Sequence, residues 1–256
     1  VGFDCFINTG SSSEYGIKEV PMHEDLVLEP ISEYAVAKAA ATQFCLKEAR
    51  MNKLPIYTIR PFSVYGDYEL HTRLIPTVIV NALTGSPIHL SAPHFVRDYI
   101  YIADMVDLYL AVASQRPTAA HVFNGGTGTQ STIQDVIDTV QALCGGALVV
   151  RWGAHTPRPW EPRRWQAVVT RAQAVLGWQA RYDLKAGLAA SIRWFEQHRQ
   201  EYQKEAGTST YQSRHPGGGR GPEQIKQDSG YSLDPGLRRD DSFVALCKVN
   251  KEIEKP

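Results

Sequence analysis

Short apolar runs alternate with helix-forming segments along the first 200 residues, and this alternation is what most constrains the fold. Residues 4–9 are predicted as a buried strand that leads into a Gly-Ser turn. Residues 31–51 contain no Gly or Pro and follow Pro30, so we predict a long helix there. Residues 56–59 form a second β-rich run, which Arg60 and Pro61 close. This order of strand, helix and strand is typical of a layered α/β protein.

The remainder of this region continues the pattern. Helices are predicted at residues 73–83, 104–113, 131–143, 170–176 and 184–200, and strands at 98–101 and 122–123. Ser131 or Thr132 is expected to cap its helix, with Gln134 or Asp135 three residues later completing a capping box. A chain of 256 residues with 43% hydrophobic content can bury a sizeable core.

The character of the chain changes near residue 207. Residues 213–222 and 232–241 are rich in Gly, Pro and charge, so burial cannot offset the entropy of ordering them. We expect residues 207–256 to form a disordered tail, and the second stretch resembles the translation product of dispersed bacterial repeat DNA. A functional binding tail is the alternative. The predicted domain is residues 1–206.

Composition argues against several classes of function. Lys plus Arg and Asp plus Glu both number 27, so the chain lacks the basic excess that nucleic acid binding needs. The four cysteines are scattered, with no C-x-x-C pair and no His at ligand spacing, so no metal site is expected. No apolar run reaches the ~18 residues that a membrane helix needs. We expect a cytoplasmic protein that binds neither nucleic acid nor membrane.

Tyr34 and Lys38 are the first candidate catalytic residues. They stand four residues apart in the predicted long helix, so their side chains share a face. An ammonium within about 4–6 Å of a phenol favours the phenolate, which suits a general base acting on a hydroxyl. The spacing alone is also typical of an ordinary solvated helix surface.

Two flanking segments strengthen this interpretation. Residues 9–16, which include Ser11, Ser12 and Ser13, follow the first strand, and residues 60–66 follow the next one. Open parallel sheets bind their ligands at the carboxyl ends of strands, so both segments are expected at one rim. Taken singly, they are also compatible with a hydroxyl-rich turn and a Pro-Gly loop. Together, the serine-rich segment, the Tyr34 and Lys38 pair and the segment 60–66, in this order, indicate a ligand-binding or catalytic site.

Four motifs carry a resemblance to a known family. The order S-S-x-x-Y-G, Y-x-x-x-K, R-P-x-x-V-Y-G and R-D-Y-I-Y-I-x-D, within residues 3–200, resembles the extended short-chain dehydrogenase/reductase family of NAD-dependent nucleotide-sugar epimerases and dehydratases. The resemblance implies an α/β fold with a partial Rossmann-like, doubly wound parallel sheet that lacks its first strands. It also implies a small C-terminal α/β substrate-binding part. No G-x-x-G-x-x-G motif is present, so the resemblance implies an N-terminally truncated member.

The resemblance assigns roles by position. Ser11, four residues before Tyr15, matches the catalytic Ser/Thr of the family, and Tyr34 matches its catalytic base. Lys38 matches the lysine that assists this base and also holds the nicotinamide ribose. Tyr34, Lys38, Pro61 and Phe62 are therefore the expected cofactor-binding residues, for NAD or NADP. A nucleotide-diphosphate sugar is the expected substrate, with Arg97 on its phosphates. The expected substrate-binding residues are Ser12, Ser63, Leu74, Arg97, Arg158 and Glu161.

The resemblance implies hydride chemistry at sugar C4, and three functions stay open. An epimerase oxidises C4 and returns the hydride to the other face, a 4-keto-6-deoxy-sugar reductase performs only the return, and a non-catalytic remnant binds nucleotide sugar or dimerises. Dehydration is disfavoured because Ser13 stands where dehydratases place a Glu, two residues before Tyr15. Glu14 is one position away, and in an extended segment it would face the opposite side. A homodimer is expected from the resemblance.

Overall fold

The structure is a computed structural model, and it describes residues 2–118, 121–153, 162–199 and 202. All of these belong to one compact unit, Val1–Thr210. The predicted tail, residues 207–256, lies outside the described residues.

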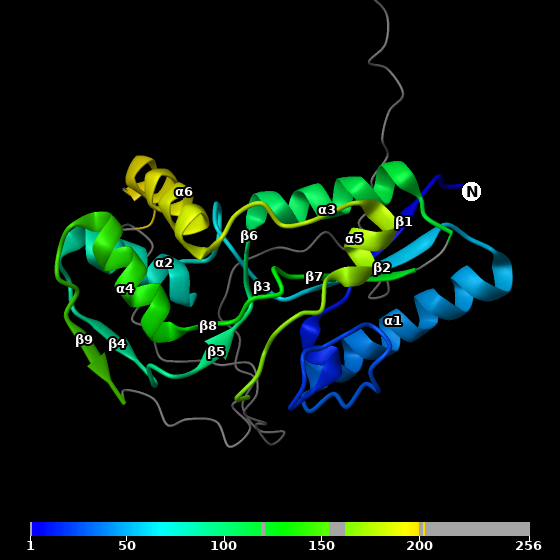
Figure 1. Ribbon diagram of the computed structural model, residues 1–256, viewed down its shortest axis with the longest axis horizontal. Coiled ribbons are helices and arrows are strands. Elements are labelled where there is room, and N and C mark those ends of the chain that lie inside the picture. The colour runs from blue at the N-terminus through cyan, green and yellow to red at the C-terminus, as the bar shows by residue number, and fades with distance from the viewer. Residues whose placement is uncertain (1, 119–120, 154–161, 200–201, 203–256) are drawn as a thin grey trace, which may run out of the picture. The chain divides into compact units, whose positions relative to one another are not determined.

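A three-stranded parallel sheet forms the centre of the fold. Its strands are β1 (Phe6–Thr9), β2 (Ile56–Pro61) and β7 (Val122–Gly125), in the spatial order β1, β2, β7. Figure 1 shows α1 (Glu33–Asn52) on one face and α3 (Ile102–Gln115) on the other, which explains why the first five residues of β2 are all buried. The predicted α/β class with a partial doubly wound parallel sheet is confirmed.

Small side chains let α1 pack closely on this sheet. Its buried residues are Ala35, Ala39, Thr42 and Ala49. The helix begins at Glu33, two residues after the predicted start, because the Ser32 hydroxyl accepts a hydrogen bond from the Ala35 amide and caps the first turn. The sheet register aligns Thr9 with Ile59 and Pro61 with Gly125, so the carboxyl ends of all three strands meet at one rim.

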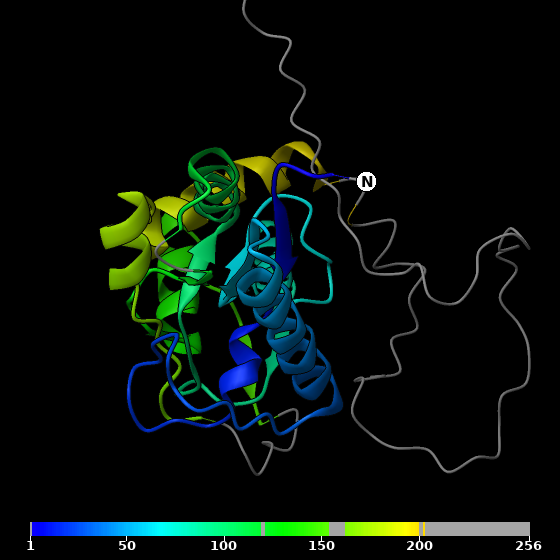
Figure 2. The same ribbon diagram turned by 90° about the vertical axis from the view of Figure 1, so that its right-hand side faces the viewer.

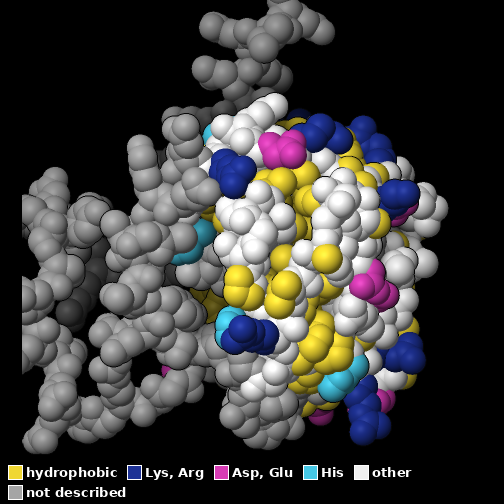
Figure 3. Space-filling view, turned by 90° about the vertical axis from the view of Figure 1, so that its left-hand side faces the viewer, with side chains coloured by type: hydrophobic (Ala, Val, Ile, Leu, Met, Phe, Trp, Pro, Cys, Tyr) yellow, Lys and Arg dark blue, Asp and Glu magenta, His cyan; other side chains and the backbone are white. Residues whose placement is uncertain are grey.

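A smaller part of the chain has a core of its own. Three helices build it, namely α2 (Leu74–Thr84), α4 (Ile133–Cys144) and α6 (Leu184–Gln197), together with the parallel pair β4 (Ile88–Leu90) and β9 (Val150–Trp152). Ile79, Ile137, Leu188 and Phe195 are among its buried side chains. Figure 3 views this side, where apolar side chains are exposed between scattered basic and acidic ones. The arrangement agrees with the expected smaller α/β part.

Short ladders connect these two regions. The strands β3 (Ser63–Tyr65) and β6 (Tyr99–Tyr101) pair in parallel, and β5 (Val96–Arg97) pairs antiparallel with β8 (Ser131–Thr132). The predicted capping box of α4 is confirmed as Thr132 with Asp135, and α5 spans Thr170–Leu176 as predicted. The last helix ends at Gln197, short of the predicted residue 200. Among the described residues, no helix has the length and apolarity that a membrane crossing requires.

Candidate active site

Ser11 opens a tight turn directly after β1. Its hydroxyl oxygen accepts a hydrogen bond from the Ser13 amide at 3.1 Å, and its own amide donates to Glu14 Oε1 at 2.8 Å. This capping box starts the 3-10 helix η1 (Ser12–Tyr15), which lies beside α1 (Figure 2). The expectation that Glu14 lies on an extended segment is therefore wrong, because the Ser11 cap winds the segment into a helical turn. Ser11 and Ser12 are both buried.

Lys38 links the start of α1 to the end of β1. Its Nζ donates a hydrogen bond to the Thr9 carbonyl oxygen at 2.8 Å and lies 5.7 Å from the centre of the Tyr34 ring. Tyr34, one turn earlier on α1, is 58% exposed. The Lys38 amine therefore bridges the Tyr34 face of α1 and the strand end that leads into Ser11.

A buried network of polar side chains supports the floor of this rim. Arg60 Nε donates to Glu14 Oε2 at 2.8 Å, and another nitrogen of the same guanidinium donates to the Tyr15 hydroxyl at 3.0 Å. The Tyr15 hydroxyl in turn donates to Asn124 Oδ1 at 2.6 Å. Arg60 is 2% exposed and Glu14 is fully buried. Because buried charges are costly unless paired, each member depends on the others.

Two other tyrosines near the rim are poorly suited to accept a proton. Burial raises the pKa of Tyr15 to about 12, although the neighbouring Arg60 lowers it. Burial also raises the pKa of Tyr109, whose hydroxyl shares a 2.7 Å hydrogen bond with the Thr9 hydroxyl. Both phenols therefore keep their protons near neutral pH. Tyr34 is the exposed tyrosine at this end of α1.

The loop after β2 is fixed by backbone hydrogen bonds. The Phe62 amide donates to the Gly125 carbonyl at 2.8 Å, and the Ser63 amide donates to the Asp98 carbonyl at 2.9 Å. Phe62 is buried, and its ring lies 6.5 Å from that of Tyr15. The structure therefore brings Pro61 and Phe62 to the rim that holds the Ser11 turn.

Asp98 anchors the strand that carries Arg97. Its fully buried carboxylate accepts hydrogen bonds from the amides of Thr127, Gly128 and Ala167 and from the Thr127 hydroxyl. Burial raises the pKa of this carboxyl, and these donors oppose the shift. Sequence reasoning named Arg97 and overlooked Asp98, although both stand in the R-D-Y motif.

The remaining predicted substrate residues are dispersed. Arg97 ends β5, half-buried, with its guanidinium 5.7 Å from the centre of the Trp165 ring. Leu74 is the first residue of α2 in the smaller part. Arg158 and Glu161 lie outside the described residues, so the structure does not place them.

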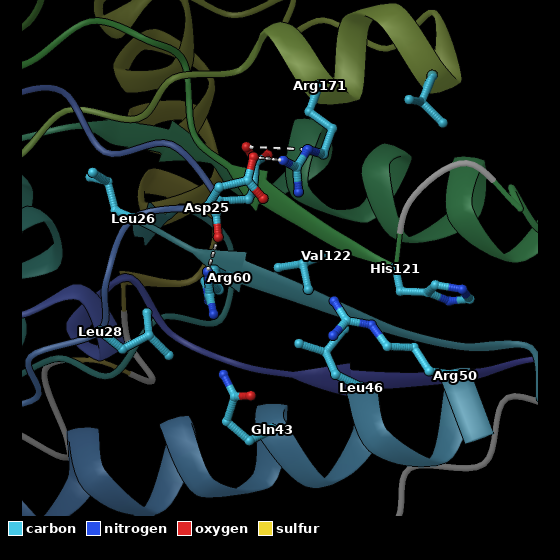
Figure 4. A pocket seen from close by; sticks show the side chains of 12 residues that line it. Asp25, Leu26, Leu28, Gln43, Leu46, Arg50, Arg60, His121, Val122 and Arg171 are labelled. Carbon is cyan, nitrogen blue, oxygen red and sulfur yellow. Dashed lines mark hydrogen bonds and ion pairs between the residues drawn. The ribbon is translucent and has the colours of Figure 1, made fainter. Parts of the chain in front are cut away.

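A cavity of about 580 Å³ adjoins this site through Arg60. Figure 4 shows it lined by residues of α1, such as Gln43 and Arg50, and by Arg171 of α5. Arg171 pairs with Asp25 and lies 3.7 Å from a Glu24 carboxylate oxygen, and its hydrogen bond lowers the pKa of Asp25. Ser11, Tyr34 and Lys38 do not line this cavity. Within the described residues no cluster of His, Cys, Asp or Glu could hold a metal ion.

The chain is similar to several known proteins. The chain is similar to a trifunctional UDP-glucose 4,6-dehydratase, UDP-4-keto-6-deoxy-D-glucose 3,5-epimerase and UDP-4-keto-L-rhamnose reductase from Arabidopsis thaliana, with 27% identity over 75% of this chain and 29% of the relative. It is similar to the structure of UDP-glucuronic acid 4-epimerase from Bacillus cereus with UDP-glucuronic acid and NAD. That match has 27% identity and a TM-score of 0.69 over 77% of this chain and 63% of the other.

A third similarity concerns the structure of MoeE5 with UDP-glucuronic acid and NAD. The identity is 31% and the TM-score 0.69, over 75% of this chain and 64% of that one. The chain thus spans less than two thirds of the length of each of these relatives. Residues 1–126, which include the Ser11 turn, Tyr34, Lys38 and the Arg60 loop, match the model of one family. That family is the NAD dependent epimerase/dehydratase family, and the match covers just under half of the chain.

Proposed function

We propose that this chain carries the catalytic and nucleotide-sugar-binding part of an NAD(P)-dependent nucleotide-sugar epimerase that acts at sugar C4. The main support is the position of Lys38, whose amine bonds to the Thr9 carbonyl at 2.8 Å and lies 5.7 Å from the Tyr34 ring centre. These two contacts put the Lys38 amine between the Tyr34 ring and the end of β1, at the carboxyl end of a parallel sheet, where such sheets bind ligands.

The residues present fit one end of a nicotinamide cofactor. The Tyr34 hydroxyl and the Lys38 amine are donors of the kind that ribose hydroxyls bind, and Pro61 and Phe62 would lie beside the nicotinamide. When bound, the cofactor accepts a hydride and returns it. The G-x-x-G-x-x-G motif that cradles the pyrophosphate is absent from the sequence. The Bacillus cereus 4-epimerase and MoeE5 structures both contain NAD, which supports this part of the proposal.

The chemical roles follow from position and exposure. Tyr34 takes the proton of the C4 hydroxyl and later gives it back, because it is the exposed tyrosine at this end of α1. Lys38 offsets the negative charge that Tyr34 gains. Ser11 orients the hydroxyl group of the sugar. Tyr15 and Tyr109 remain protonated, since burial raises the pKa of each.

Arg97 is the proposed ligand of the sugar diphosphate. A planar guanidinium binds phosphate through paired hydrogen bonds, and Arg97 is only half-buried at the end of β5. The similar Bacillus cereus 4-epimerase and MoeE5 structures contain UDP-glucuronic acid, a diphosphate-linked sugar, and this similarity supports the role. The proposed companions of Arg97 are Ser12, Ser63, Leu74, Arg158 and Glu161.

Epimerisation is favoured over dehydration by the state of Glu14. Ser13 occupies the position at which dehydratases of the family place a Glu, and a serine hydroxyl is a weak acid. The neighbouring Glu14 carboxylate is fully buried and accepts hydrogen bonds from Ser11, Thr42 and Arg60. Both of its oxygens are therefore hydrogen-bonded within the protein. The G-S-S-x-E-Y-G form suits a 4-keto-6-deoxy-sugar reductase as the second candidate.

A fusion protein tests the proposal. The part of the Bacillus cereus 4-epimerase that this chain does not cover would be joined ahead of this chain, and the fusion would be incubated with NAD and a panel of UDP-, dTDP- and GDP-sugars. Interconversion of C4 epimers, followed by proton NMR, is the expected result. Consumption of NADH or NADPH with a 4-keto-6-deoxy sugar alone would establish the reductase instead. Nucleotide-sugar binding without any product would establish the non-catalytic alternative.

The proposal includes a homodimer and a cytoplasmic location. The resemblance places the pairing on two long helices, one of which bears Tyr34 and Lys38. The apolar side chains of Val36 and Phe44 on α1 are 53% and 65% exposed, which suits such a contact. Sedimentation equilibrium of the fusion protein is expected to give twice the monomer mass, and a monomer at micromolar concentration would contradict the dimer.

A further inference from the structure

Three segments of the chain converge on the carboxylate of Glu14. Its Oε1 accepts hydrogen bonds from the Ser11 amide at 2.8 Å and from the Thr42 hydroxyl at 3.0 Å. Its Oε2 accepts one from Arg60 Nε at 2.8 Å. The serine turn, α1 and β2 are thus joined through a single fully buried side chain.

Thr42 belongs to the part of α1 that carries the proposed catalytic pair. It follows Lys38 by four residues and Tyr34 by eight, so the three side chains stand in successive turns of one helix. Lys38 bonds to the Thr9 carbonyl, and Thr42 bonds to Glu14. Two hydrogen bonds, from residues one helical turn apart on α1, therefore connect this helix to Thr9 and to Glu14, the two ends of the segment that contains Ser11.

The Glu14 carboxylate is closely packed against the backbone that precedes Ser11. A Cβ added at Gly10 would lie 2.4 Å from Glu14 Oε1 and 2.9 Å from the Thr58 methyl carbon. The backbone before Ser11 therefore lies directly against the carboxylate. Both oxygens are hydrogen-bonded, and Oε1 joins the Ser11 amide to the Thr42 hydroxyl of α1.

We infer that Glu14 is a positioning residue for Ser11, and that it acts through Thr42 by fixing the Ser11 turn against the helix that bears Tyr34 and Lys38. The inference rests on the proposed function for its catalytic consequence. The tether itself is a property of the chain that can be measured without substrate.

Thr42 offers a cleaner test than Glu14 itself. Removing Glu14 leaves Arg60 buried and unpaired, which alone destabilises a protein strongly. Thr42→Val keeps the shape and removes the hydroxyl, which donates to Glu14 and also accepts from Asn8 at 3.4 Å, whereas Thr42→Ser keeps the hydroxyl. Thr58→Val is the matched control, because Thr58 is also buried, and its hydroxyl accepts from Asn8 as that of Thr42 does but makes no hydrogen bond to Glu14 among the described residues.

The first measurement is amide hydrogen exchange of residues 10–13 in the full chain. Thr42→Val is expected to speed exchange of the Ser11 amide by about 10-fold, since the carboxylate that accepts it loses its second anchor. Thr42→Ser and Thr58→Val are expected to leave this amide as in the wild type. Unchanged exchange in Thr42→Val would overturn the tether.

The second measurement is turnover of the fusion protein. A displacement of Ser11 by about 1 Å is expected to lower kcat by about 10- to 100-fold in Thr42→Val, with KM for the nucleotide sugar within about 2-fold. Thr42→Ser is expected to recover kcat, and Thr58→Val to retain it. Faster exchange with unchanged kcat would reduce Glu14 to a structural role and overturn the inference. An inactive wild-type fusion would count against the proposed function, and the exchange comparison would then decide the tether alone.

Discussion

The Lys38 amine donates a hydrogen bond to the carbonyl oxygen of Thr9 at 2.8 Å, and this bond joins the first turns of α1 to the end of β1. Lys38→Met keeps the aliphatic stem and removes the donor. We expect the free energy of unfolding to fall by only about 0.5–1.5 kcal/mol, the net worth of one hydrogen bond. We expect turnover of the fusion protein to fall by about 100-fold or more.

Thermal unfolding and steady-state kinetics check this prediction side by side. Lys47→Met is the control, because Lys47 lies on the same helix and its side chain is 60% exposed. Loss of stability without loss of turnover in Lys38→Met would show that the lysine only holds the helix to the strand.

Arg60 is predicted to be the arginine whose loss is most costly to stability. Arg60→Met leaves the Glu14 carboxylate buried without its charged partner, and breaking a buried pair in this way costs about 3–5 kcal/mol. Denaturant unfolding of the full chain measures the change. Arg193→Met, on the exposed side of α6, is expected to alter the free energy of unfolding by less than about 0.5 kcal/mol. Equal losses for the two variants would refute the assigned role.

Glu69 is predicted to make stability depend on pH. Burial raises the pKa of its carboxyl from 4.5 to about 7, against the opposing effect of Arg73, and its Oε2 has no hydrogen-bond partner among the described residues. Between pH 4.5 and 7 the folded chain therefore holds more protons than the unfolded chain. The free energy of unfolding therefore falls as pH rises through this window, and it has lost the whole contribution of Glu69 above pH 7.

Glu69→Gln removes this dependence. We expect the variant to be more stable than the wild type at pH 8, by on the order of 1–3 kcal/mol, and to match it at pH 4. Urea unfolding at the two pH values measures the difference, with Glu196→Gln on α6 as the control for loss of an exposed carboxylate. If the difference in free energy of unfolding between Glu69→Gln and the wild type were the same at pH 4 and pH 8, the buried charge would be contradicted.

Gly187 is predicted to be required by the approach of α6 to Tyr65. A Cβ at this position would lie 2.0 Å from the Tyr65 hydroxyl oxygen. Gly187→Ala is expected to destabilise the chain by about 1–3 kcal/mol, and Tyr65→Phe in the same chain is expected to recover part of the loss. Gly146→Ala, where nothing lies within 4 Å, is the control. Strictly additive effects of the Gly187 and Tyr65 changes would rule out the clash.

Local signals explain which elements could be predicted from the sequence. Pro30 and an Ala-rich run identify α1, and Thr132 with Asp135 identifies the start of α4. The strands β5 and β8 have two residues each, and β4 and β9 have three, so none of them carries a readable period. Their pairing depends on contacts between segments far apart in the sequence.

The same distinction applies to the candidate site. Tyr34 and Lys38 were identifiable because their spacing is local, and Ser11 because it follows a strand. The partners of Glu14 could not be identified from the sequence, because Arg60 is 46 residues away and Thr42 is 28 residues away. Asp98 binds donors up to 69 residues away. The sequence did offer one signal for the buried pair of Glu14 and Arg60. Each of two motifs near a strand end contains a charged residue, Glu14 in S-S-x-x-Y-G and Arg60 in R-P-x-x-V-Y-G.

The most direct test of the central claim is the turnover of the fusion protein with Tyr34→Phe. The variant removes one hydroxyl from a side chain that is 58% exposed, so the melting temperature is expected to stay within about 1 °C of the wild type. Turnover is expected to fall by about 100- to 10,000-fold, while Tyr68→Phe, at a tyrosine that is 82% exposed, retains it. Turnover of Tyr34→Phe within 2-fold of the wild type would contradict the assignment of Tyr34 as the base.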